Sequence, residues 1–464
     1  MNANVQSFRL ILAHAKLEEK PHQIQGLQWC LENELNTGRF AGRKIRGGFI
    51  ADEMGLGKTL TMIGTIFCNF KPPTLIVLPV ALITQWHDEI LRTTGHTAVI
   101  FHGKGKKDIS RETLEKSPIV LTSYNTICVN TATAKGATLL HEVRWHRVIF
   151  DEAHHLRNHK TTRFVGAKML DANIRWLVSG TPVQNKKADF HALCNLLRLP
   201  ASVYTDTAKI SLIYKHFILK RTKREVGIDL PNVMDKSSVV QWTNAVEEAF
   251  CGGFHSKLGF IERKPPGDNE ESFKTIQLLT KAKQSCTLPK LLFPRTLEEK
   301  EETCEMGASK MDAVVETILN RMDNGNGKLV FCHYKEEINV LVQRLREGGV
   351  ERVVSLDGRD SALARATILS QKYDILVLQI QTGCEGLNLQ QNYSEIFFVT
   401  PHWNPSVEDQ AIGRCHRMGQ TKPVSVFRFE MAPPLQKSDT CISFDNYVTF
   451  VQNKKRELVN EILP

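Results

Sequence analysis

The residues best suited to chemistry lie in the segment DEMGLGKT, Asp52 to Thr59, directly after the apolar run GGFIA. A strand that ends in a glycine-rich turn and continues into a helix points backbone amides at phosphate oxygens. Gly55 and Gly57 allow the backbone to come close, and Lys58 is placed to reach the outer phosphates. Thr59 can hold a magnesium ion through its hydroxyl. The candidate phosphate-binding residues are Asp52, Glu53, Met54, Gly55, Leu56, Gly57, Lys58 and Thr59.

This loop departs from the usual phosphate-loop pattern at one position. The pattern has a glycine five positions before the Gly-Lys pair, where this chain has Asp52. The alternative interpretation is a glycine turn that ends an ordinary strand, because short motifs also occur by chance.

A second chemical element is RVIFDEAHHLRN, Arg147 to Asn158, in which the strand-like run VIF precedes two carboxylates. Parallel sheets place their ligands at the carboxyl ends of their strands. Asp151 can there hold a magnesium ion, and Glu152 can polarise or deprotonate a water molecule. Adjacent carboxylates also occur at solvated strand ends. The paired histidines that follow, and a separation of about one hundred residues from the first loop, which suits several strand-helix units, favour a site.

These blocks resemble the superfamily-two helicase-type ATPases, and among them the Swi/Snf-related family of double-stranded DNA translocases. The resemblance runs from about Lys20 to Phe429. It implies ATP and Mg²⁺ as cofactors, with Gln23 in the adenine-recognising segment KPHQIQGLQW. The further matching segments are Leu75–Ile90, Leu121–Ile127, Leu177–Asn185, Lys328–Leu345 and Tyr393–Phe429.

The last of these segments carries the pattern QxxxRxxR at Gln410, Arg414 and Arg417. In the family this block faces the nucleotide from the second lobe, where an arginine stabilises charge on the transferring phosphoryl group. Spacings of four and three residues predict that the three side chains share one face of a helix or its terminal turn. Without the flanking match, a basic surface helix would be the preferred interpretation.

The motifs most resemble the helicase-like transcription factor type of repair translocases. Members of that group commonly carry a zinc-binding ring finger, but none of the eleven cysteines here forms a CxxC pair. We therefore expect no zinc module and no ubiquitin-ligase role. The chain also departs from the family where Gly383, Cys384, Glu385 and Gly386 precede Leu387, and at Gln379 and Gln381.

Composition is consistent with an intracellular DNA-binding protein. The chain has 464 residues, a net charge of +10, 42% apolar residues and 24% charged residues. Positive charge suits a polyanion. No apolar run reaches membrane-spanning length and no secretory signal begins the chain. The basic clusters Lys104–Lys107 and Ile218–Val226 are candidates for a DNA groove, although a solvated loop explains the first equally well. The family resemblance implies a nuclear location.

Alternating strand and helix patterns predict an α/β fold of two tandem RecA-like, doubly wound parallel-sheet lobes joined by a helical bridge. We expect a leader helix over residues 1–20, lobe 1 over 21–225, the bridge over 226–306, lobe 2 over 307–432 and a tail helix over 433–464.

The resemblance implies an ATP-dependent translocase on double-stranded DNA that remodels or displaces DNA-bound proteins or nucleosomes. Two alternatives remain at this stage: a strand-separating DNA or RNA helicase, and a nucleotide-gated nucleic-acid-binding protein without turnover. The presence of Lys58, Glu152 and Arg417 counts against the second alternative.

Overall fold

The computed structural model describes residues 2–130, 136–181, 186–260, 273–293, 306–383, 387–434 and 441–462. The chain forms two compact units. Unit 1 comprises residues 1–229 and 457–464, and unit 2 comprises residues 230–456.

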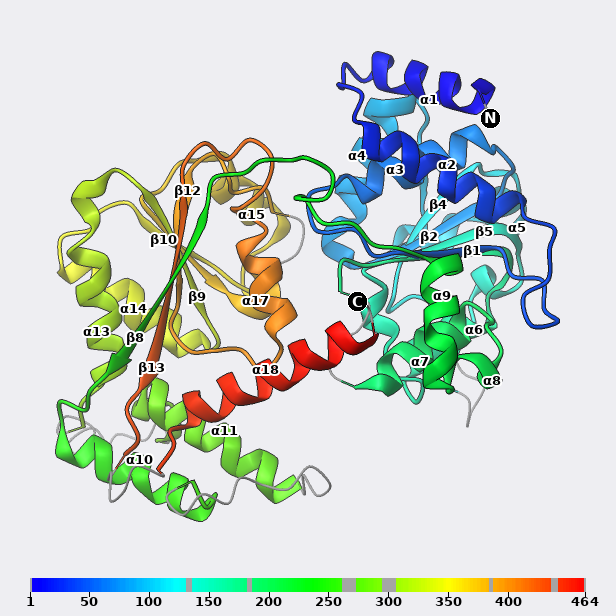
Figure 1. The fold of residues 1–464 in the computed structure, drawn as a ribbon. Helices are drawn as coiled ribbons and strands as arrows, with labels where there is room; N and C mark the ends of the chain where they lie inside the picture. Colours follow the sequence, from blue (N-terminus) through cyan, green and yellow to red (C-terminus); the bar gives the residue numbers. More distant parts are fainter. Residues whose placement is uncertain are drawn as a thin grey trace. The chain divides into compact units, whose positions relative to one another are not determined.

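Unit 1 is built on a seven-stranded parallel sheet with the order β3-β4-β2-β5-β6-β1-β7 (Figure 1). Its strands are β1 (Gly47–Ile50), β2 (Thr74–Leu78), β3 (Val99–Ile100), β4 (Ile119–Ser123), β5 (Arg144–Asp151), β6 (Asp171–Val178) and β7 (Ile218–Leu219). Both faces of this sheet are covered, because Val148 and Phe150 of β5 lie in one core cluster and Ile149 lies in another. Burial on both faces explains why these strands are continuous apolar runs.

The helices of unit 1 connect these strands. They are α1 (Asn2–His14), α2 (Pro21–Leu35), α3 (Lys58–Cys68), α4 (Ile83–Thr94), α5 (Arg111–Lys116), α6 (Thr162–Met169), α7 (Lys187–Leu196), α8 (Ala201–Tyr204) and α9 (Ile210–Phe217). Helix α1 packs through Phe8 and Leu12 on α2 and α3. Short 3-10 turns include η4 (Ala153–Leu156), directly after the predicted acidic pair.

Unit 2 is built on a six-stranded parallel sheet with the order β10-β11-β9-β12-β13-β8. Its strands are β8 (Val233–Val240), β9 (Gly327–Cys332), β10 (Val353–Leu356), β11 (Ile375–Gln379), β12 (Tyr393–Phe398) and β13 (Val424–Met431). Strand β8 lies in the region where the sequence indicated a helical bridge, and it pairs along its whole length with β13 (Figure 1). Residues 230–260 and the described residues up to 306 therefore belong to the same compact unit as this sheet.

The helices of unit 2 also cover both faces of their sheet, since Phe397 of β12 joins one core cluster and Phe398 joins the other. They are α10 (Ala245–Lys257), α11 (Phe273–Thr287), α13 (Ser309–Leu319), α14 (Lys335–Glu347), α15 (Ala362–Ser370), α16 (Ile380–Gly383) and α17 (Pro405–Ile412). Two doubly wound lobes of parallel sheet confirm the predicted fold class.

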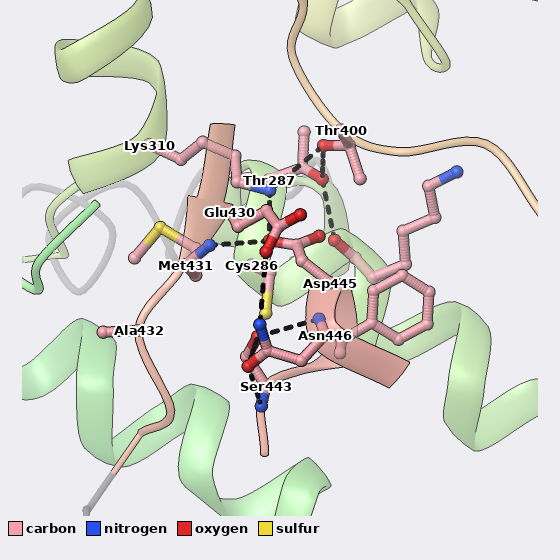
Figure 2. A network of polar contacts seen from close by, with 12 residues as sticks. Cys286, Thr287, Lys310, Thr400, Glu430, Met431, Ala432, Ser443, Asp445 and Asn446 are labelled. Carbon is pink, nitrogen blue, oxygen red and sulfur yellow. Dashed lines mark hydrogen bonds and ion pairs between the residues drawn. The ribbon is translucent and has the colours of Figure 1, made fainter. Parts of the chain in front are cut away.

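A buried polar network joins the elements at one end of the unit 2 sheet (Figure 2). The Lys310 Nζ of α13 donates to the Asp445 Oδ2 of α18 (Phe444–Ile462) at 2.6 Å. The same carboxylate oxygen accepts the backbone N–H of Met431 at 2.8 Å. Thr287 of α11 and Thr400 exchange a hydrogen bond of 2.8 Å between their hydroxyls. Because Lys310 and Asp445 are fully buried, each charge depends on the other for compensation.

Helix α18 contributes to both units. Its residues up to Arg456 belong to unit 2, and residues 457–464 belong to unit 1. Leu458, Val459 and Ile462 pack against the apolar core of unit 1. Among the described residues, no helix combines the length and the apolar character that crossing a membrane requires.

Candidate functional site

The loop between β1 and α3 has the backbone that the phosphate-binding prediction requires. Gly55 and Gly57 have φ values of 94° and 82°, in the left-handed region where a side chain is strained. Gly57 is the N-cap of α3. A Cβ atom at Gly57 would lie 2.4 Å from the Gln23 Nε2, so a side chain here would have to displace Gln23 as well as strain the backbone.

Lys58 is the first residue of α3, and its ammonium group lies over the loop. The Lys58 Nζ donates to the backbone carbonyl of Asp52 at 2.8 Å and to that of Glu53 at 3.3 Å. A Cβ at Gly180 would lie 3.4 Å from the same Nζ, so the segment after β6 also borders this cation. An ammonium held by neutral carbonyl oxygens can exchange them for phosphate oxygens, which bind it more strongly because they are charged.

The two acidic residues of the loop are held by the segment that follows β7. The Arg221 guanidinium binds both oxygens of Asp52, with Nε to Oδ1 at 3.1 Å and Nη2 to Oδ2 at 2.6 Å. The Lys223 Nζ lies 2.9 Å from the Glu53 Oε1, and the Lys223 backbone N–H donates to the other oxygen at 2.8 Å. The backbone N–H of Glu53 in turn donates to the Arg221 carbonyl at 2.9 Å.

These contacts change the interpretation of the basic cluster Ile218–Val226. Arg221 and Lys223 pair with the loop carboxylates, so both charges already have a partner within unit 1, and a DNA contact by this cluster stays a prediction. They also give a structural role to Asp52, which stands where the usual phosphate-loop pattern has a glycine. Its carboxylate binds the Arg221 guanidinium. Gly26 of α2 leaves the space for this guanidinium, since a Cβ there would lie 2.9 Å from the Arg221 Nη2.

The predicted carboxylate pair lies at the carboxyl end of β5, two strands from β1 in the sheet. The Asp151 Oδ2 accepts from the Trp86 Nε1 at 2.7 Å, and its Oδ1 accepts the Glu152 backbone N–H at 3.1 Å. Burial, together with the Glu152 charge, raises the pKa of Asp151 to about 7. A buried carboxylate with this pKa is one that a nearby cation would stabilise.

Glu152 has the left-handed backbone conformation, with φ at 51°. This conformation is costly for a residue with a Cβ and concentrates at functional sites. The Glu152 Oε2 lies 3.2 Å from the His154 Nδ1, and that nitrogen lies 3.4 Å from the Ser179 hydroxyl. Ser179 follows β6, which lies between β5 and β1 in the sheet. The strained turn therefore connects the carboxylate pair to the segment beside Lys58.

Gln23 lies on α2 next to the phosphate loop. The side chain is buried, and within the described part of the chain its Oε1 has no hydrogen-bond partner. Its neighbour His22 contacts the Leu56 carbonyl through Nε2 at 3.2 Å. Helix α2 is anchored by Glu34, which forms a fully buried ion pair with Arg147 of β5. An unpartnered buried amide oxygen suits the amino group of a base.

The remaining predicted residues form a separate group in unit 2. Gln410 is on α17 and is buried, whereas Arg414 and Arg417 lie in the turns just beyond the end of this helix at Ile412. The Arg417 guanidinium donates to the Asn388 side-chain oxygen. Burial, followed by the neighbouring Arg414 charge, lowers the pKa of Arg417.

The structure thus brings Gln23, the loop residues Asp52–Thr59, Asp151 and Glu152 together in unit 1. It places Gln410, Arg414 and Arg417 in unit 2. Residues 384–386, where the sequence departs from the family pattern, lie outside the described residues. Residues 182–185 of the segment after β6 also lie outside them. The Gln379 side chain is half-buried and donates to the His333 carbonyl at 3.3 Å.

Two domain families match the sequence, and the first match extends past the end of unit 1 at residue 229. The SNF2-related domain matches residues 22–291, and the helicase conserved C-terminal domain matches residues 309–419. The chain is 29% identical to a probable global transactivator of the Orgyia pseudotsugata multicapsid polyhedrosis virus, over 95% of this chain and 90% of that protein.

Other relatives are longer proteins. The chain is 25% identical to an uncharacterized ATP-dependent helicase of Mycoplasma genitalium, over 99% of this chain and 44% of that protein. It is 27% identical to the ATP-dependent DNA helicase DDM1 of Arabidopsis thaliana, over 90% of this chain and 59% of that protein. The chain thus spans about half the length of these two relatives.

Among solved structures, the Sulfolobus solfataricus SWI2/SNF2 ATPase core in complex with dsDNA matches 97% of this chain and 96% of that chain, with 25% identity and a TM-score of 0.42. The SNF2-related domain by itself covers more than half of the sequence. The chain therefore belongs to the SNF2-related family and is a DNA-dependent ATPase of the helicase type.

Proposed function

We propose that this protein uses ATP hydrolysis to move along double-stranded DNA and so remodels or displaces DNA-bound proteins. The observation that carries the nucleotide part is the placement of Lys58, Asp151 and Glu152 at the carboxyl ends of β1 and β5, which lie on either side of β6 in one parallel sheet. That edge is where such sheets bind ligands.

The proposed roles follow from the contacts of each side chain. The loop amides and Lys58 bind the phosphates, and Gln23 binds the adenine through its free amide oxygen. Glu152 accepts the proton of the attacking water, held by the strained turn that fixes its backbone. Asp151 and Thr59 are the oxygen donors that would hold a magnesium ion, whose charge would offset that of the phosphates. The raised pKa of Asp151 fits a carboxylate that lies beside a cation during turnover.

Unit 2 supplies the residues for coupling hydrolysis to movement. Arg414 and Arg417 are proposed to reach the nucleotide when the lobes close, with Gln410 beside them. Closure and opening would then alternate the grip of the two lobes on DNA. The SWI2/SNF2 core from Sulfolobus is named as a complex with dsDNA, which is consistent with duplex DNA as the track.

The nature of the displaced protein is a further part of the proposal. Nucleosomes are one candidate, on the family resemblance, and chromodomain-helicase-DNA-binding proteins are among the relatives. A repair role of the helicase-like transcription factor type, and a nuclear location, also rest on resemblance alone.

The test compares hydrolysis with double-stranded DNA, single-stranded DNA and RNA, and follows a labelled third strand on a duplex. We expect duplex DNA of any sequence to stimulate hydrolysis most. We also expect ATP-dependent release of the third strand while the duplex stays paired. Stronger stimulation by RNA, or separation of the duplex, would instead support the helicase alternative. Binding without any turnover would support the nucleotide-gated alternative.

A further inference from the structure

Three side chains that can ligate a metal converge in the interior of unit 2, and none of them is among the residues proposed to bind the nucleotide. Cys251 and His255 lie one helical turn apart on α10, and Cys286 lies near the end of α11. All three are fully buried. Their ligand atoms lie within 4.8 Å of one another. One ion can therefore reach all three atoms.

The individual distances resemble the edges of a metal coordination shell. The two sulfur atoms are 3.3 Å apart. The His255 Nε2, the ring nitrogen that can ligate, is 3.8 Å from the Cys286 Sγ. With zinc–sulfur bonds of about 2.3 Å, tetrahedral geometry needs sulfur atoms about 3.8 Å apart. The two sulfur atoms would thus need to move apart by about 0.5 Å to accommodate the ion, which is a small adjustment for two side chains.

The imidazole already has the orientation of a metal ligand. The His255 Nδ1 donates to the Cys251 carbonyl at 2.8 Å. This bond fixes the tautomer and leaves the Nε2 as the acceptor, which receives the Phe444 backbone N–H at 2.9 Å. Ligating histidines almost always have their second nitrogen held in this way. An ion bound at the Nε2 would displace the Phe444 N–H from this nitrogen.

Charge favours a divalent ion. Two thiolates and a neutral imidazole around a 2+ ion have no net charge, whereas a 1+ ion would leave a buried negative charge. Beside the cluster, Lys310 and Asp445 already compensate each other (Figure 2). We propose that Cys251, His255 and Cys286 bind a zinc ion. The Ser285 hydroxyl could serve as the fourth ligand, because its Oγ lies 3.2 Å from the Cys251 Sγ.

The consequence of such a site is structural. The ion joins α10 to α11, and through His255 it lies next to the first residue of α18. Figure 2 shows Cys286 beside Thr287, Lys310 and Asp445, the residues that tie these helices to the sheet. The absence of CxxC pairs from the sequence is compatible with this site, because its ligands come from two helices and include only one cysteine of each.

The test is metal analysis of the full chain, purified with zinc sulfate and then dialysed. We expect about one zinc ion per chain, and at least a tenfold lower content in Cys251→Ser and Cys286→Ala. Cys332→Ser is the matched control, because Cys332 is also fully buried in unit 2 but lies on β9. This control should retain its zinc.

A second measurement does not depend on the variants folding. A zinc chelator should lower the melting temperature of the unsubstituted protein by several degrees, and added zinc should restore it. Cobalt in place of zinc should show a sulfur-to-cobalt charge-transfer band that Cys286→Ala lacks. An unsubstituted protein with no zinc and no response to the chelator would overturn the proposal. Exclusive binding of copper(I) would also overturn it, because the charge argument would then be wrong.

Discussion

Arg221 and Asp52 form a two-pronged ion pair across 169 positions of sequence, between the segment that leaves unit 1 and the start of the phosphate loop. The pair is largely enclosed, with 14% of the arginine side chain and 3% of the aspartate side chain exposed. The same guanidinium also donates to the His22 carbonyl at 2.5 Å. Arg221 therefore connects the loop both to α2 and to the chain that continues towards unit 2.

The first prediction concerns this pair. Arg221→Ala leaves the Asp52 carboxylate enclosed without its cation, so we expect the free energy of unfolding to fall by about 3 kcal/mol. Because Arg221 holds the loop through the Asp52 carboxylate, we expect the KM for ATP to rise more than kcat falls. Urea unfolding and steady-state hydrolysis measure the two effects. Glu89→Ala is the control, since Glu89 pairs with Arg92 on the surface of the same unit. This substitution should lower the free energy of unfolding by about 0–1 kcal/mol.

A double variant distinguishes the contribution of the Arg221–Asp52 contact from that of the other contacts of Arg221. If the contact is what matters, adding Asp52→Asn to Arg221→Ala should cost less than the sum of the two single effects. Additive losses would show that Arg221 acts through its other contacts alone.

The second prediction concerns turnover. Lys58→Ala should abolish hydrolysis and weaken ATP binding, because it removes a phosphate contact. Glu152→Gln should abolish hydrolysis while ATP still binds, because it removes only the proton acceptor. Fluorescent-nucleotide binding and phosphate release with duplex DNA distinguish the two. Near-normal hydrolysis in Glu152→Gln would contradict the proposed role of this carboxylate.

The third prediction concerns the arginines of unit 2. By analogy with arginine fingers, Arg417→Ala should lower kcat by about 10³ to 10⁵ and leave nucleotide affinity nearly unchanged. Single-turnover measurements at saturating ATP report this rate directly. Lys422→Ala, at an exposed position of the same unit, should have little effect. A variant of Arg417 that loses binding but keeps its rate at saturation would exclude the finger role.

The fourth prediction concerns acid stability. Burial lowers the pKa of His402 to about 4, below the ordinary value of about 6.5. Between these values the unfolded chain binds the proton and the folded chain does not, so stability falls as the pH falls from 6.5 to 4. His402→Gln should make this loss shallower. Some loss should remain, because His333 stacks on His402 at 5.5 Å and burial lowers its pKa as well.

Unfolding midpoints in urea at several pH values would measure this dependence. His159→Gln, at an exposed position, should leave the pH profile unchanged. An identical profile for His402→Gln and the unsubstituted protein would show that other groups govern the acid response.

The sequence was sufficient for the fold class and for the grouping of Lys58, Asp151 and Glu152. Apolar runs mark buried parallel strands, and polar residues directly after such runs must meet at one edge of the sheet. The roles of these residues stay predictions. The predicted domain boundaries also stay predictions. Strand β8 lies within the predicted helical bridge, in a polar stretch where the sequence did not indicate a strand. Nearly all of its residues are exposed at the sheet edge, so its sequence VMDKSSVV lacks the apolar signal.

Other features depend on contacts that no local pattern encodes. Arg221 looked like one of several basic residues, because its partner Asp52 is distant in sequence. The positive φ of Glu152 has no signal in the sequence, since glutamate has no preference for that conformation. The convergence of Cys251, His255 and Cys286 likewise requires the packing of α10 on α11.

The split membership of α18 has a consequence for the order in which the protein is made. During synthesis, the residues of the unit 1 sheet emerge from the ribosome before any of unit 2, and domains generally begin to fold in that order. Leu458, Val459 and Ile462, which complete the unit 1 core, emerge only after the whole of unit 2. The nascent unit 1 therefore lacks this part of its apolar core until the whole of unit 2 has been translated. During this period, a chaperone that binds apolar surface can bind unit 1 at the positions that Leu458, Val459 and Ile462 later cover.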